Sequence, residues 1–132
     1  MYLLDTNAWI HLLTGRSPEL ANRLAEHDPT EVRTCAVVVA ELLHGARRSA
    51  RVEENLRLVR EMMAPFHCLD FTTRCAEEYG VIRLDLERSG RVIGPLDMLI
   101  AATARAHDAT LVTHNIDEFC RVAGLRIEDW EG

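Results

Sequence analysis

The chain has 132 residues, of which 48% are hydrophobic and 27% are charged, and its formal net charge is −6. This length and the mixing of charged with apolar residues predict one globular domain over residues 1–132 and exclude a disordered chain. No apolar run approaches the roughly 20 residues of a membrane helix, so a membrane protein is not expected.

Short apolar segments alternate with longer segments of helical periodicity along the whole chain. In chain order we predict a strand at 2–5 that runs into a turn, a helix from 18 to about 28, a strand at 32–38, a helix that carries Glu41 and fades at 45, a helix from 52 to 64, a strand at 66–71, a helix after Thr72 that runs until 89–90, a helix from 95 to about 107, a strand at 109–113, a helical turn at 117–122 and a last edge strand at 125–127.

Capping and breaking residues set the ends of several of these elements. Ser17 and Pro18 are typical of an N-cap followed by a proline in the first helical turn. Thr72 can cap the helix that follows it, and Pro65 and Gly90 mark places where helices end. Alternating strands and helices favour right-handed βαβ crossovers. The predicted fold class is therefore α/β, with a mostly parallel sheet covered by helices on both faces.

Three acids each stand alone inside an apolar stretch. Asp5 ends the opening run, and no other Asp, Glu or Arg occurs before Arg16. Glu41 and Asp97 are similarly isolated within apolar segments. A buried carboxylate is costly unless a cation or hydrogen-bond donors compensate it, so three such residues suggest one shared cation. A carboxylate cluster that holds Mg²⁺ or Mn²⁺ is the natural candidate.

The predicted elements bring these acids toward one edge of the sheet. Asp5 ends the first strand, Glu41 lies in a helix after the second, and Asn115 and Asp117 follow the fourth. Asp97 lies at a helix start, where the helix dipole favours a negative charge. Ligands of parallel sheets bind outside the carboxyl ends of the strands, so the segments are expected to converge there.

Each residue also has a purely structural interpretation. Asp5 can cap the turn after the first strand, and Asp97 can be a helix N-cap. Asp117 and Glu118 can be ordinary acids of a first helical turn. Glu41 is harder to explain in this way, because a solvated helix face would not surround an acid with Val37 and Leu42.

The remaining composition narrows the chemistry further. The chain has no glycine-rich phosphate loop, no nucleophile elbow and no zinc motif, and its four cysteines show no paired short spacing. All fifteen basic residues are Arg. Arg is the better ligand for phosphate, but a lysine-free chain is equally consistent with genomic base composition. The N-terminus lacks the features of a signal peptide, so a cytoplasmic protein is expected.

Taken together, these motifs resemble those of the PIN-domain ribonucleases, and most closely the VapC-like toxins of type II toxin–antitoxin modules. The resemblance rests on Leu-Asp-Thr-Asn at 4–7, Ala-Glu-Leu-Leu-His-Gly-Ala at 40–46, Gly-Pro-Leu-Asp-Met-Leu-Ile-Ala-Ala at 94–102, Leu-Val-Thr-His-Asn at 111–115 through Phe119, and Gly-Leu-Arg-Ile-Glu-Asp-Trp at 124–130. Each motif is weak alone, but together they span nearly the whole chain in the right order.

The resemblance implies a Rossmann-like α/β/α sandwich with a central parallel sheet. It implies Mg²⁺- or Mn²⁺-dependent endonucleolytic cleavage of RNA that leaves 5′-phosphate and 3′-hydroxyl ends, homodimerisation, and inhibition by a cognate antitoxin. Asp5, Glu41 and Asp97 would then be the metal-binding acids. Thr6 and Asn7 would orient the first acid, and Thr113 would support the last motif.

The chain departs from many relatives at one position. They carry an acid where this chain has Asn115, and others of the branch have Asn there with an acid two or three residues later, like Asp117 and Glu118 here. An Asn oxygen can ligate a metal or its water but adds no charge. The expected catalytic set is Asp5, Glu41, Asp97, Asn115 and Asp117, with the fourth acidic ligand open between Asn115, Asp117 and Glu118.

Two groups of Arg flank this predicted site and could contact RNA phosphates, Arg47, Arg48 and Arg51 after the Glu41 helix and Arg88 and Arg91 before Asp97. A solvated face or antitoxin contacts explain them equally well. Two rival functions stay open. One is a PIN-domain nuclease of RNA maturation without an antitoxin, and the other is a non-catalytic RNA- or protein-binding module of the same fold.

Overall fold

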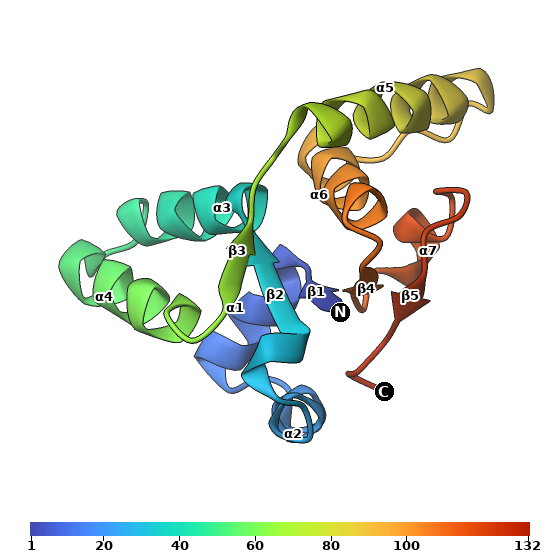
Figure 1. Ribbon diagram of the computed structural model, residues 1–132. Coiled ribbons are helices and arrows are strands. Elements are labelled where there is room, and N and C mark those ends of the chain that lie inside the picture. Colours follow the sequence, from blue (N-terminus) through green and yellow to red (C-terminus); the bar gives the residue numbers. More distant parts are fainter.

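Five short parallel strands run through the centre of the molecule, in the spatial order β3-β2-β1-β4-β5 (Figure 1). The computed structural model describes all residues, 1–132. The strands are β1 (Tyr2–Leu4), β2 (Val32–Cys35), β3 (His67–Leu69), β4 (Thr110–Val112) and β5 (Ile127–Glu128). Every neighbouring pair is parallel; Leu3, for example, pairs with Arg33 on one side and with Leu111 on the other.

Helices connect the strands and cover both faces of the sheet, which gives the α/β/α sandwich that the sequence predicts. They are α1 (Thr6–Thr14), α2 (Pro18–Ala25), α3 (Ala36–Arg47), α4 (Val52–Met63), α5 (Thr73–Arg88), α6 (Pro95–Ala106) and α7 (Ile116–Phe119), with a 3₁₀ turn at Pro29–Glu31. Figure 1 shows α3 beside α4 and α5 beside α6 as two helical pairs, and both pairs are in contact. None of the helices combines the length and the apolar character that a membrane span requires.

The core lies where β1 and its neighbours meet the helices. Leu3, Leu4 and Leu111 of the central strands are fully buried, together with Trp9 of α1 and Ile100 of α6. The C-terminal segment completes this core, because Trp130 is only 1% exposed and its ring stacks on His27 at 4.8 Å.

One helix that the sequence analysis missed is α1. Residues after 5 were expected to form a turn, but Thr6–Thr14 is helical. The segment contains Thr, Asn, Trp and Ile, which have modest helix propensity, so no strong periodic signal was visible. Capping and packing determine the outcome. Asp5 caps the first turn, Ala8 and Trp9 are buried, and Gly15 ends the helix with a left-handed φ of 66°.

The predicted strand at 32–38 was too long at its carboxyl end. The strand stops at Cys35, and α3 begins at Ala36 and continues past Gly45 to Arg47. The run Val37-Val38-Val39 is β-branched and favours a strand locally, but Val38 is fully buried as part of α3. The last strand was placed slightly too early, since β5 is Ile127–Glu128 rather than 125–127.

Candidate active site

Four carboxylates from four separate segments lie together beyond the carboxyl ends of the central strands. Asp5 directly follows β1, and Glu41 lies in the second turn of α3, behind β2. Asp97 is in the first turn of α6, and Glu118 is in α7, which follows β4. The sheet order places β2, β1 and β4 side by side, so the segments that leave their ends share one edge.

Asp5 is the most deeply buried of these acids, with 4% of its surface exposed. Its Oδ1 accepts a hydrogen bond from the Ala8 backbone N–H at 2.9 Å, and its Oδ2 accepts one from the Thr113 hydroxyl at 2.6 Å. Burial raises the pKa of Asp5, and these two hydrogen bonds oppose the rise. The residue therefore caps α1 and belongs to the acidic cluster at the same time.

Glu41 is tied to the first turn of α1. Its Oε1 accepts a hydrogen bond from the Thr6 hydroxyl at 2.7 Å. The expectation that Thr6 and Asn7 orient Asp5 was wrong, because the Thr6 hydroxyl binds Glu41 and the Asn7 side chain is exposed and makes no hydrogen bond. The Oε2 atom of Glu41 accepts no hydrogen bond from the protein and is free to act on a ligand.

Asp97 shows most clearly that the acids are close to one another. Burial, a hydrogen bond with Glu118, and the charges of Glu118, Glu41 and Asp5 raise the pKa of Asp97 to about 7. The alternative in which Asp97 is an N-cap is wrong, since Gly94 occupies that position and Asp97 is the third helical residue. Its carboxylate faces the cluster instead.

The segment after β4 places Glu118, rather than Asp117, against the other acids. The Asn115 amide donates to Glu118 Oε2 at 3.0 Å, and the Asn115 backbone N–H donates to the Thr113 hydroxyl at 2.9 Å. Asn115 occupies the N-cap position before α7, but its side chain does not cap the helix. Asp117 is exposed, and no side-chain hydrogen bond or ion pair joins it to the cluster.

The donor set of this cluster fits a hard divalent cation. The groups are carboxylate oxygens, none of the four takes part in an ion pair with Arg or His, and their mutual repulsion is visible in the raised pKa of Asp97. No three His, Cys, Asp or Glu side chains are arranged to ligate one ion directly. Mg²⁺ commonly uses one or two carboxylates and retains several waters, so the arrangement fits an ion held partly through water.

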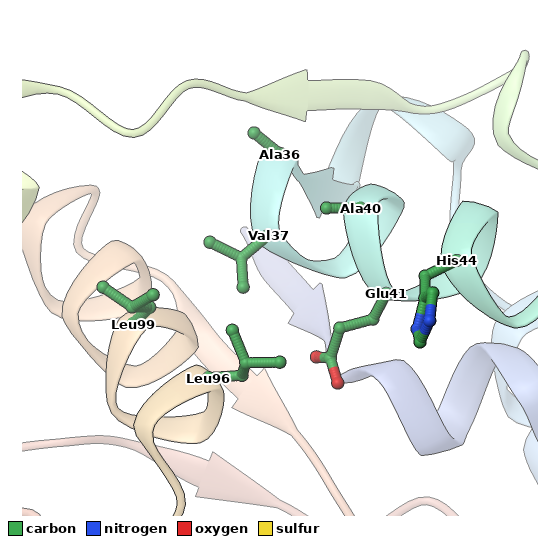
Figure 2. A pocket seen from close by; sticks show the side chains of 7 residues that line it. All are labelled: Ala36, Val37, Ala40, Glu41, His44, Leu96 and Leu99. Carbon is green, nitrogen blue, oxygen red and sulfur yellow. The ribbon is translucent and has the colours of Figure 1, made fainter.

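Two apolar grooves meet at Glu41. The larger, of about 490 Å³, lies between α3 and α6 (Figure 2) and is lined by Ala36, Val37, Ala40, Glu41, His44, Leu96 and Leu99. The second, of about 330 Å³, lies between α1, α3 and α4 and includes Ile10, Leu42 and Leu58. The predicted RNA-binding Arg residues line neither groove, and Arg51 pairs with Glu54 at 3.4 Å.

Known proteins resemble this chain over nearly its whole length. Residues 2–125 match the PIN domain family. The chain is 35% identical to the tRNA(fMet)-specific endonuclease VapC of Shigella flexneri and 34% identical to ribonuclease VapC2 of Rickettsia felis, covering at least 98% of this chain and 97% of each relative.

Solved structures extend the likeness to three dimensions. VapBC2 from Rickettsia felis, bound to a DNA fragment from its promoter, matches with a TM-score of 0.90 at 35% identity over 98% of both chains. DNA-bound VapBC from Salmonella typhimurium matches with a TM-score of 0.92 at 33% identity, over 98% of this chain and 97% of that one.

Proposed function

The chain belongs to the PIN-domain family, and within it to the VapC ribonucleases, and we propose that it is a Mg²⁺- or Mn²⁺-dependent endoribonuclease. The observation that carries the proposal is the convergence of Asp5, Glu41, Asp97 and Glu118, none of which forms an ion pair with Arg or His. Residues 1–132 would act as one PIN domain, in the cytoplasm, on an RNA substrate.

The proposed roles of the acids follow from their contacts. Asp5, Glu41 and Asp97 would hold the ion, with Glu118 beside Asp97 as the fourth acid. A bound divalent ion would activate water and stabilise the charge that develops on the scissile phosphate. Thr6 fixes one oxygen of Glu41, so that Oε2 can accept the proton of the attacking water. Cleavage would leave a 5′-phosphate and a 3′-hydroxyl.

Asn115 has a supporting role in this proposal, in contrast to the direct role expected from the sequence. Its amide donates to Glu118, which keeps that carboxylate turned toward Asp97. Asp117 is exposed, so we do not assign it a role in holding the ion. Of the three candidates for the fourth acid, we therefore favour Glu118.

We further propose that the protein is the toxin of a toxin–antitoxin pair, forms a homodimer and is inhibited by a cognate antitoxin. This rests on full-length likeness to VapC proteins, two of which were solved as VapBC assemblies on DNA. The Shigella flexneri relative is named for cleavage of tRNA(fMet), so this tRNA is the first substrate to test.

The test is cleavage of tRNA(fMet) and of total RNA by the purified protein with Mg²⁺, with Mn²⁺ and with a chelator. We expect cleavage only with a metal, and no cleavage by Asp5→Asn. Co-purification with the product of a small neighbouring reading frame should abolish the activity. If the protein cleaves RNA but no neighbouring gene product inhibits it, an RNA-maturation nuclease would be favoured. If the protein binds metal but cleaves no RNA, a non-catalytic module would be favoured.

A further inference from the structure

The groove between α3 and α6 has walls that the proposed chemistry does not use. Val37 on α3 and Leu96 on α6 face each other across it, and Leu99 extends the apolar wall (Figure 2). Leu96 is 46% exposed, so its side chain is accessible to a ligand beside the acids. Glu41 is the only acid in the lining, so the groove leads directly to the acidic cluster.

We propose that this groove binds the base of the nucleotide next to the scissile phosphate of single-stranded RNA. The inference rests on the proposed nuclease function and assigns a substrate subsite to it. When the scissile phosphate lies at the acids, a neighbouring nucleoside must lie against the walls beside them. A phosphate is a poor occupant of these walls, because they carry no cation and adjoin clustered carboxylates, whereas the flat faces of a base are uncharged and pack well on aliphatic side chains.

The position of Glu41 also decides between RNA and a permanently docked protein segment. Glu41 lines the groove and is the proposed proton acceptor, so any occupant that stayed in place would cover the reacting centre. The groove must therefore be open in the active nuclease. Its volume of about 490 Å³ falls within the usual range for small-ligand sites, which is ample for one nucleoside.

His44 lines the same groove and provides a ring on the other side of Glu41 from Leu96. It lies one helical turn beyond Glu41 on α3, and in Figure 2 the Glu41 carboxylate lies between Leu96 and His44. The His44 side chain is exposed and makes no hydrogen bond or ion pair within the protein. Aromatic and imidazole rings of this kind stack on unpaired bases in RNA complexes, so His44 is assigned to the base on the opposite side of the cleaved bond.

The test pairs changes in the protein with changes in the RNA. The cleaved bond is first located by sequencing RNA ends, and an oligonucleotide spanning it is made intact and with an abasic nucleotide on either side of the bond. Wild type is compared with Leu96→Ser, with His44→Ala and with Leu84→Ser. Leu84 on α5 is a matched control, because it is 47% exposed and does not line the groove.

We expect Leu96→Ser to raise KM for the intact oligonucleotide about tenfold, the size of one lost base contact, with a smaller change in kcat. On one of the two abasic oligonucleotides, the one that lacks the base bound by the groove, Leu96→Ser should leave KM almost unchanged, because the contact with that base is already missing. His44→Ala should couple in the same way to the other position. Leu84→Ser should behave like wild type on all three oligonucleotides.

Several results would overturn the inference while leaving the nuclease proposal intact. The clearest is active enzyme for which the protein and RNA changes are additive at both positions. If light scattering shows that Leu96→Ser dissociates a dimer, and the effect of the substitution on cleavage does not depend on either base, the groove is an interface between two copies of the chain. Failure of the wild type to cleave any RNA would instead overturn the nuclease proposal itself.

Discussion

The acidic side chains are held in place by hydrogen-bond donors from the protein. The Thr113 hydroxyl donates to Asp5, the Thr6 hydroxyl donates to Glu41, and the Asn115 amide donates to Glu118. Thr113 also accepts the Asn115 backbone N–H, which joins two of these interactions. Such contacts orient ligand oxygens before a metal arrives, and their loss commonly weakens metal sites.

We predict that Asp97→Asn abolishes RNA cleavage without loss of the fold. The substitution keeps the size of the side chain but removes a charge that burial and three neighbouring acids oppose. The metal-free variant should therefore melt at the same temperature as the metal-free wild type or higher. A folded Asp97→Asn protein that retains full ribonuclease activity would contradict the proposed metal site.

Asn115 and Glu118 should behave as one functional unit. We predict that Glu118→Gln raises the Kd for Mn²⁺, that Asn115→Ala raises it less, and that the double variant resembles Glu118→Gln alone. The physical reason is that the Asn115 amide acts through Glu118, while its backbone bond to Thr113 persists in the alanine variant. Calorimetric titration measures all four proteins, and additive effects would mean that Asn115 contacts the ion independently.

The candidate site could be predicted in part from isolated residues. Asp5, Glu41 and Asp97 stood out because each is a lone acid in an apolar run, and the structure brings all three together. Glu118 could not be separated from Asp117 by sequence, because both lie in the first turn of a short helix. Their different exposure depends on how α7 is rotated after β4, which no local pattern specifies.

At the scale of elements, strong periodicity and clear caps predicted α5 and α6 almost to the residue. Errors occurred where local preference and tertiary packing disagree. The valines after Cys35 favour a strand but lie in α3, and α1 has poor helix formers but a buried Trp9. In both cases, the connection from a central strand to the next helix is tighter than local propensity suggests.

Glycines at two kinds of helical position should respond oppositely to alanine. Gly15 ends α1 with a φ of 66°, whereas Gly80 lies inside α5 with no atom near an added Cβ. We predict that Gly15→Ala destabilises the protein by about 1 kcal/mol, because a side chain disfavours the left-handed conformation. Gly80→Ala should stabilise it by about 0.5–1 kcal/mol. Urea denaturation measures both, and a shift of the same sign in the two variants would contradict this account.

At the scale of the whole molecule, the metal-free fold contains a built-in repulsion. The cluster adds to a formal net charge of −6, and folding brings its acids together from segments more than a hundred residues apart. The C-terminal segment has two opposite effects. The charge of Glu131 contributes to the raised pKa of Asp5, whereas the buried Trp130 and the 2.5 Å contact between Glu131 and His11 stabilise the fold. A cation that binds only the folded state should relieve the repulsion and raise the melting temperature.

The pH dependence of stability follows from the same cluster. The pKa of Asp97 is about 7 in the folded protein against 3.8 ordinarily, so between these values the folded state holds a proton that the unfolded state has lost. Stability must therefore fall as pH rises through this window, and the raised pKa of Asp5 acts in the same direction. The pKa of His114, which pairs with Asp129, is also raised, so this residue too lowers the stability of the fold as pH rises. The wild type must therefore be compared with a variant that lacks only the Asp97 charge.

We predict that the metal-free wild type loses several degrees of melting temperature between pH 5 and pH 8 relative to metal-free Asp97→Asn. Saturating Mn²⁺ should remove most of this difference for the wild type at pH 8, because the ion replaces the proton as the partner of the carboxylates; at a hundred times its Kd it stabilises the fold by about 2.7 kcal/mol. Asp97→Asn should gain much less from the metal. If the melting temperatures of the two metal-free proteins change in parallel with pH, the neighbouring acids do not affect Asp97. The close approach of the four acids would then be wrong.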